Sequence, residues 1–189
     1  MADQLNEEER SILLRLARQA LEAGVCNQAL IPLDLEALPA SLREAGATFV
    51  TLTRGGELRG CVGALEAYQP LAQDVREHAI AAALQDFRFP PVEPNELPEI
   101  AIEVSRLTPP QKLEYERPED LPSLLRPGID GVVLRDGLRR ATFLPQVWEK
   151  IPDPSAFLGN LCWKMGADAN FWRYKKLQVY LYQVEEFHE

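Results

Sequence analysis

The chain has 189 residues, of which 46% are hydrophobic and 26% charged, a composition typical of globular proteins rather than disordered or fibrous ones. Its 20 lysines and arginines are outnumbered by 29 aspartates and glutamates, which gives a net charge of −9. Proteins bind phosphate backbones by neutralising them with lysine and arginine, so this balance disfavours a nucleic-acid role. One domain, or two intimate halves, is expected over residues 1–189.

The amino terminus is acidic where a signal peptide would be basic, and no apolar run approaches the ~20 residues that span a bilayer. We therefore expect a cytoplasmic protein with no membrane segment. Three cysteines (Cys26, Cys61 and Cys162) leave one thiol unpaired whichever two are joined, so all three are expected to be reduced. The two histidines, His78 and His188, are too few for a three-histidine zinc site, and we expect no metal and no cofactor.

The first half of the chain predicts a helix, a hairpin and a second helix. Asn6 and Glu9 form a capping-box pattern, and apolar residues then recur at helical spacing over 7–24. After a proline-broken connection, two β-rich runs over 48–65 surround a Gly-Gly pair, which predicts an antiparallel hairpin. A strongly helical run over 71–85 follows.

The second half mixes strands and helices. In chain order, the pattern predicts a strand over 100–105, a short helix over 118–125, a hairpin over 132–144, helices over 145–150 and 153–165, and a closing strand over 177–184. Asp136-Gly137 is a type I′ turn signal, and the helical spacing of Cys162 with apolar residues predicts a core thiol. Hairpins and lone strands between helices, without repeated βαβ units, indicate an α+β fold: an antiparallel-rich sheet with flanking helices.

The principal candidate site is the segment 58–63, Leu-Arg-Gly-Cys-Val-Gly. Strict strand alternation places Arg59 and Cys61 on one face, and a neighbouring guanidinium favours the thiolate, the nucleophilic form of cysteine. Gly60 and Gly63 carry no side chain and would let a ligand approach closely. One interpretation is an activated cysteine with Arg59 as an anion anchor. The other is a buried cysteine on a packed strand, whose glycines mark a bulge or a tight contact.

Three further residues are lesser candidates. His78 lies on the apolar stripe of its helix, four residues after Asp74, which could hold a ring nitrogen. His78 is either a catalytic base or a packing residue whose ring nitrogens have their hydrogen-bond partners. Glu103 and Ser105 share the polar face of their strand. That face is of functional interest only if it meets the strand of Cys61, and otherwise it is simply solvated.

Five motifs, in order along the chain, resemble those of a known family. They are the 58–63 segment, Arg-Phe-Pro-Pro at 88–91, Ile-Glu-Val-Ser at 102–105, Thr-Phe-Leu-Pro-Gln-Val-Trp at 142–148 and Leu-Cys-Trp-Lys-Met-Gly at 161–166. Through them the chain resembles the AMMECR-one domain family, whose prokaryotic members are called AmmeMemoRadiSam system protein A. The departures are mild: Val62 stands where isoleucine is usual, and Met165 where alanine is common.

The resemblance implies an α+β fold of two subdomains and a pathway shared with Memo-like and radical-SAM proteins, but no particular reaction. The first hypothesis is therefore a component of such a pathway, with a small-ligand or partner site at residues 58–63. The alternative is a cysteine-dependent enzyme acting on a small anionic or acyl substrate, with Cys61 as nucleophile, Arg59 orienting charge, and His78 or Glu103 as base. A nucleic-acid factor is the third, which the acidic balance disfavours.

Overall fold

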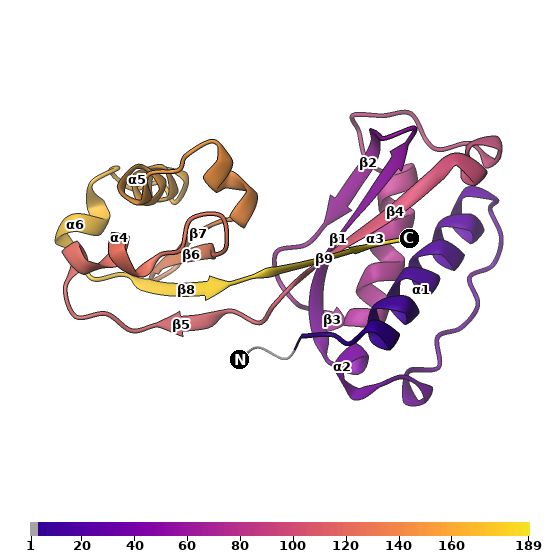
Figure 1. The fold of residues 1–189 in the computed structure, drawn as a ribbon, viewed down its shortest axis with the longest axis horizontal. Helices are drawn as coiled ribbons and strands as arrows, with labels where there is room; N and C mark the ends of the chain where they lie inside the picture. The colour runs from indigo at the N-terminus through magenta and orange to yellow at the C-terminus, as the bar shows by residue number, and fades with distance from the viewer. Residues whose placement is uncertain (1–3) are drawn as a thin grey trace. The chain divides into compact units, whose positions relative to one another are not determined.

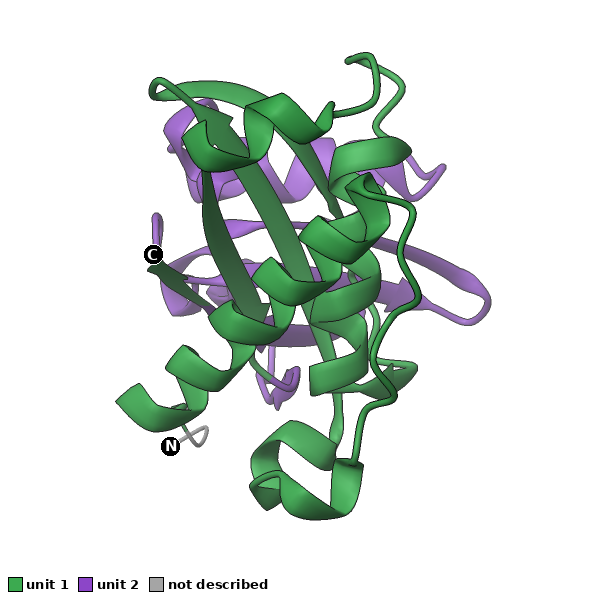
Figure 2. Cartoon of the chain, turned by 90° about the vertical axis from the view of Figure 1, so that its right-hand side faces the viewer, with its two compact units in different colours: residues 1–108, 185–189 green, residues 109–184 purple. Residues whose placement is uncertain are grey.

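The computed structural model describes residues 4–189 and contains two antiparallel sheets with helices packed against them (Figure 1). This confirms the α+β class with antiparallel sheets and flanking helices. The chain divides into two compact units, residues 1–108 with 185–189, and residues 109–184 (Figure 2). Unit 2 is thus an insertion between consecutive parts of unit 1. The expectation that the two form one intimate domain stays a prediction.

Unit 1 is built on a five-stranded sheet. Its elements are α1 (Glu7–Val25), η1 (Leu35–Ala37), α2 (Ala40–Arg43), β1 (Ala45–Arg54), β2 (Glu57–Gly63), β3 (Gln69–Pro70), α3 (Leu71–Leu84), η2 (Pro94–Glu99), β4 (Ile100–Leu107) and β9 (Val184–His188). The strand order is β2-β1-β4-β9, with β3 paired to one end of β1. Helices α1 and α3 pack together on one face of this sheet (Figure 2). Between them lies an aliphatic core that includes Leu13, Leu52, Val75 and Ile102.

Helix α1 begins as its sequence predicts. The Glu9 N–H donates to Asn6 Oδ1 at 2.9 Å, and the Asn6 N–H donates to Glu9 Oε2 at 2.8 Å. This capping box satisfies two backbone donors that the first turn would otherwise leave free. Leu13 and Leu21 then fall on the buried face of the helix. The predicted helix is confirmed, and its amphipathic stripe explains why it packs on α3.

The first predicted hairpin is confirmed, with one irregularity in register. Strands β1 and β2 pair antiparallel around two glycines that both have positive φ. The register changes between Leu52, which faces Gly60, and Thr53, which faces Leu58, so Arg59 is the extra residue of a β-bulge. Strict alternation over 58–63 is therefore wrong at its start, because the bulge places Leu58 on the same face of the sheet as Cys61.

Unit 2 is a four-stranded sheet with helices on it. Its elements are β5 (Gln111–Leu113), η3 (Pro118–Asp120), α4 (Leu121–Leu124), β6 (Gly131–Asp136), β7 (Arg139–Phe143), η4 (Pro145–Glu149), α5 (Pro154–Lys164), α6 (Phe171–Tyr174) and β8 (Gln178–Tyr182), with strand order β5-β8-β6-β7. Phe157 of α5 stacks on Trp148 with ring centroids 3.6 Å apart. Cys162 is fully buried in this core, as its spacing predicts.

Three local predictions in unit 2 need correction. The second hairpin is antiparallel, but Asp136 pairs with Arg139, so the turn residues are Gly137 and Leu138. Of these two, Gly137 alone has a positive φ, which is the type II′ pattern rather than type I′. The helix over 145–150 is a 3₁₀ helix, a form that short, proline-led segments often take. The closing strand predicted over 177–184 is present as β8 but ends at Tyr182, and a separate strand, β9, then joins the sheet of unit 1.

Across residues 4–189, no helix has both the length and the apolar character that a bilayer span requires.

Candidate functional site

Cys61 lies on β2, the edge strand of the unit 1 sheet, and its backbone is held by two side chains of the loop after α3. The Cys61 N–H donates to Asp86 Oδ2 at 2.8 Å. The Cys61 carbonyl oxygen accepts from Arg88 Nη2 at 3.3 Å. An edge strand normally leaves such groups unpaired, so Asp86 and Arg88 occupy the position where another strand would bind.

The two side chains also bind each other. Arg88 Nε donates to Asp86 Oδ1 at 2.9 Å, and Arg88 Nη2 donates to Asp86 Oδ2 at 2.7 Å. The Arg88 guanidinium, with help from the Cys61 N–H, holds the pKa of Asp86 well below its usual range. Asp86 raises the pKa of Arg88 in return, and the Cys61 side chain adds a smaller effect in the same direction. Arg88 is therefore the guanidinium next to the thiol.

Arg59, the predicted anion anchor, is engaged elsewhere. Its guanidinium forms a bidentate pair with Glu96, Nε to Oε1 at 2.8 Å and Nη2 to Oε2 at 2.9 Å. It also donates to the carbonyl oxygens of Pro90 and Pro91 at 2.9 and 3.3 Å. Arg59 chiefly, together with a backbone N–H, lowers the pKa of Glu96 to about 2. The role predicted for Arg59 needs correction, because the bulge and these partners tie it to the segment 90–96.

A row of three side-chain positions crosses the sheet at Cys61. In the register, Thr51 of β1 faces Cys61 on one side and Glu103 of β4 on the other. The Thr51 hydroxyl donates to Cys61 Sγ at 3.4 Å, and the thiol is half-buried. The polar face of β4 therefore lies on the same side of the sheet as Cys61, but β1 stands between β4 and the strand of Cys61. Glu103 lies two strand spacings away from it, roughly 9–10 Å between backbones.

Ser105 and Gly63 belong to the next row of side-chain positions on the same face of the sheet. Both face Phe49 of the central strand, Ser105 from β4 and Gly63 from β2. Sequence reasoning missed Thr51, which is the central member of the neighbouring row. The register of the predicted hairpin would have paired Cys61 with Val50, because a two-residue Gly-Gly turn fixes which residues face each other. The bulge at Arg59 shifts the pairing by one residue and brings Thr51 opposite Cys61.

His78 lies on the other side of the sheet. Its Nδ1 is 3.1 Å from Asp74 Oδ2 and 3.3 Å from the Thr48 hydroxyl, so the predicted contact with Asp74 is confirmed. Asp74 is fully buried and also accepts from the Thr48 N–H at 2.8 Å. Thr48 points to the helical face, whereas Thr51 and Cys61 point to the opposite one. The sheet therefore separates His78 from Cys61, which corrects its prediction as a base for that thiol.

Packing accounts for both glycines of the segment. A β-carbon on Gly60 would lie 2.1 Å from the Ala82 carbonyl oxygen of α3. A β-carbon on Gly63 would lie 2.4 Å from the Phe49 ring and from the Thr48 carbonyl oxygen. A side chain at either position would collide with the protein itself, so tight strand and helix packing explains why both are glycines. Their predicted ligand-binding role stays a prediction.

Within residues 4–189, no three histidine, cysteine, aspartate or glutamate side chains gather into a group that could hold a metal ion.

The loop that holds Cys61 also exposes an aromatic side chain. Phe87, between Asp86 and Arg88, is 96% exposed. Leu58, on the strand beside this loop, is exposed as well. We refer to Leu58, Cys61, Phe87 and Arg88 as the edge-strand surface.

Comparisons with known proteins agree on the family. A family model described as AMMECR1 matches residues 14–187. A protein of Methanothermobacter thermautotrophicus is 41% identical over 190 residues, 98% of this chain and 96% of that protein. A protein of Thermofilum pendens is 40% identical, covering 98% and 92%. The crystal structure of uncharacterized protein PH0010 from Pyrococcus horikoshii matches with a TM-score of 0.76 and 34% identity, covering 98% of this chain and 93% of that one. The chain therefore belongs to the AMMECR1 family, as its motifs predict.

Proposed function

We propose that the chain is a binding component of a Memo- and radical-SAM-linked pathway, and that a partner protein docks on the edge-strand surface. The pathway follows from the family resemblance. The docking site follows from the way in which the loop after α3 is attached to β2. This is a proposal about binding, and it assigns no reaction to the chain.

The observation that carries the proposal is the exposure of Phe87. The residues on either side of it are fixed by the Asp86–Arg88 pair and by the hydrogen bonds to Cys61. Phe87 itself is almost entirely in water. Aromatic and arginine side chains dominate binding energy at protein interfaces. A fixed backbone also reduces the entropy lost on association, so Phe87 next to Arg88 is suited to anchoring a partner.

The geometry around the thiol gives less support to the cysteine-dependent enzyme. A nucleophilic cysteine needs a base that accepts its proton. The Thr51 hydroxyl donates to Cys61 Sγ instead. His78 lies across the sheet, and Glu103 is separated from Cys61 by a whole strand. Among the described residues the candidate nucleophile therefore lacks a contacting base, and binding is the better-supported function.

The test is a binding measurement with matched surface variants. The Memo-like and radical-SAM proteins of the same host are purified, and their affinities for the wild-type chain, Phe87→Ser and Leu138→Ser are measured by calorimetry. Leu138 is the control, because it is equally exposed at the tip of the hairpin in unit 2. We expect at least one partner to bind, Phe87→Ser to weaken it more than tenfold, and Leu138→Ser to leave it unchanged.

Two results would overturn the proposal. One is that neither partner binds the wild-type chain. The other is that Phe87→Ser and Leu138→Ser bind equally well. Thermal unfolding of both variants accompanies the measurement, and unchanged midpoints are expected because each side chain is in solvent.

A further inference from the structure

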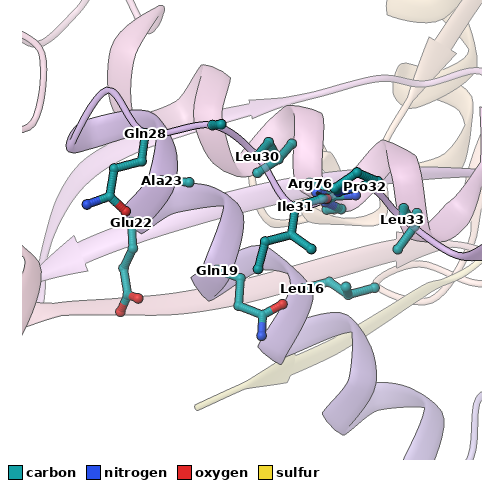
Figure 3. Close-up of a pocket in the computed structure, with 11 residues that line it drawn as sticks. Leu16, Gln19, Glu22, Ala23, Gln28, Leu30, Ile31, Pro32, Leu33 and Arg76 are labelled. Atoms are coloured by element: carbon teal, nitrogen blue, oxygen red, sulfur yellow. Dashed lines mark hydrogen bonds between the residues drawn. The ribbon is translucent and has the colours of Figure 1, made fainter.

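Unit 1 contains a cavity of about 240 Å³ on its helical side (Figure 3). One wall is the flank of α1, including Leu16. The other is the segment 28–33, which contributes Leu30, Ile31 and Leu33. Arg76 of α3 also lines the cavity and brings a positive charge to a mostly apolar space. Pockets that hold drug-sized ligands are typically ~300–1,000 Å³, so this one suits a smaller molecule.

The chain reversal after α1 creates this cavity. Asn27 has a φ of 51°, its N–H donates to the Gly24 carbonyl oxygen at 3.2 Å, and the Gln28 N–H donates to the Ala23 carbonyl oxygen at 2.8 Å. Together with the left-handed conformation of Asn27, these two hydrogen bonds form a Schellman motif. The motif turns the chain at a fixed angle, so that residues 28–33 return past the flank of α1 and leave a space between them.

Arg76 is the unusual group in the cavity. It is only 9% exposed, and one N–H of its guanidinium donates to the Ile31 carbonyl oxygen. The structure gives it no ion pair with any residue from 4 to 189. Burial lowers the pKa of this guanidinium, which reflects the cost of removing a charge from water without a counter-ion.

Two other largely buried arginines of unit 1 are paired with carboxylates. Arg106 contacts Glu185 at 3.0 Å, and Arg59 contacts Glu96 at 2.8 Å. In each case the fold supplies a carboxylate at the guanidinium. Arginine offers five donors in a planar fork that matches a carboxylate. Arg76 has this fork, the burial and an adjoining cavity, but among residues 4–189 no carboxylate pairs with it.

We propose that the cavity binds a small monocarboxylate with an apolar chain, which supplies the counter-ion of Arg76. The carboxylate pairs with the guanidinium, and the apolar chain lies against Leu16 and Leu33. In Figure 3, Glu22 and Gln28 lie at the end of the cavity away from Arg76, so a second negative charge on the ligand would face a glutamate. Inorganic phosphate is disfavoured for the same reason, and because it would leave the apolar walls uncovered.

The test uses 4-methylpentanoate as the probe, titrated into the full chain and followed by calorimetry and by amide NMR shifts. We expect saturable binding, with shifts at residues 28–33 and in α3 around Arg76. Acetate lacks the apolar chain, and leucine carries an ammonium next to its carboxylate that would face Arg76. Both should bind at least tenfold more weakly, and phosphate should not compete.

Two variants separate a binding site from a structural arginine. Arg76→Met keeps the side-chain volume but removes the charge, and it should weaken 4-methylpentanoate more than tenfold. Leu30→Trp fills the cavity from its partly exposed rim, so it should abolish binding even if Arg76→Met fails to fold. Phe87→Ser should bind the probe like the wild type, which keeps this result independent of the docking proposal. Absence of probe binding to the wild type, or unchanged binding by Leu30→Trp, overturns the inference.

Discussion

Asp86 accepts the backbone N–H of Cys61 at 2.8 Å and thereby closes the edge of the unit 1 sheet at its candidate site. A free edge at this point would invite a further strand from another chain. With Asp86 and Arg88 bound to both backbone groups of Cys61, strand addition is blocked there. A partner must therefore recognise the side chains of the edge-strand surface rather than extend the sheet, which distinguishes this site from β-augmentation.

The first prediction concerns this closure. Asp86→Ala removes the acceptor of the Cys61 N–H and the counter-ion of Arg88, so the free energy of unfolding should fall by about 2–4 kcal/mol. Urea denaturation measures it. Glu114→Ala is the control, because its pair with Lys112 is exposed to solvent and should contribute little to stability. Equal losses in the two variants would contradict the role given to Asp86.

The second prediction is a loss of stability in acid that depends on Glu96. Its pKa is about 2 in the folded protein, below the ordinary value of 4.5, chiefly because Arg59 binds the ionised form. The unfolded chain therefore takes up a proton at Glu96 before the folded chain does. The contribution of Glu96 is complete above about pH 5 and disappears as pH falls toward 2.

The measurement is urea denaturation at pH 7, 5, 3.5 and 2.5. Glu96→Gln should be less stable than wild type at pH 7 by on the order of 1–2 kcal/mol, and the difference should shrink as the pH falls. Asp86 has its pKa shifted in the same direction and remains in both proteins, so some acid sensitivity should persist in the variant. A difference that is constant from pH 7 to 2.5 would refute the assignment.

The features predictable from sequence are those encoded locally. The Asn6–Glu9 cap and the Asp74–His78 contact follow from helical spacings of three and four residues. The first hairpin follows from its glycine turn. The bulge at Arg59 carries no local signal, because one inserted residue leaves the pattern on either side unchanged.

The partners of the candidate site were also beyond sequence reasoning. Arg59 and Glu96 are 37 residues apart, and Cys61 and Asp86 are 25 apart. Such pairs are created when the segment after α3 folds back along β2, and no spacing rule anticipates this. The family motif at 88–91 did contain Arg88, but its contact with Cys61 became visible only in the structure.

The third prediction tests why the 58–63 segment contains Gly60. In Gly60→Ala the new β-carbon would meet the Ala82 carbonyl oxygen, a backbone atom that cannot move aside without displacing α3. The free energy of unfolding should fall by about 2–4 kcal/mol. Gly55→Ala is the control: its surroundings are open and its φ is +60°, so only about 1–2 kcal/mol of backbone strain is expected. Loss of partner binding without loss of stability in Gly60→Ala would return this glycine to a binding role.

The fourth prediction ranks the three thiols by reaction with iodoacetamide at neutral pH. Cys26 is exposed and should react first, Cys61 is half-buried and should react more slowly, and Cys162 should react only on unfolding. Burial raises the pKa of Cys162, which protects it further because the thiolate is the reactive form.

The variants in this experiment are chosen to test which arginine lies beside the Cys61 thiol. Arg88 donates to the Cys61 carbonyl oxygen, whereas Arg59 is bound to Glu96. Arg88→Gln should therefore slow the labelling of Cys61 several-fold, measured by mass spectrometry of its peptide, and Arg59→Gln should not. Labelling of Cys26 in the same samples is the internal reference. If Cys61 stays unlabelled in the folded wild type while Cys26 reacts fully, its thiol is inaccessible and belongs to the packing of the sheet.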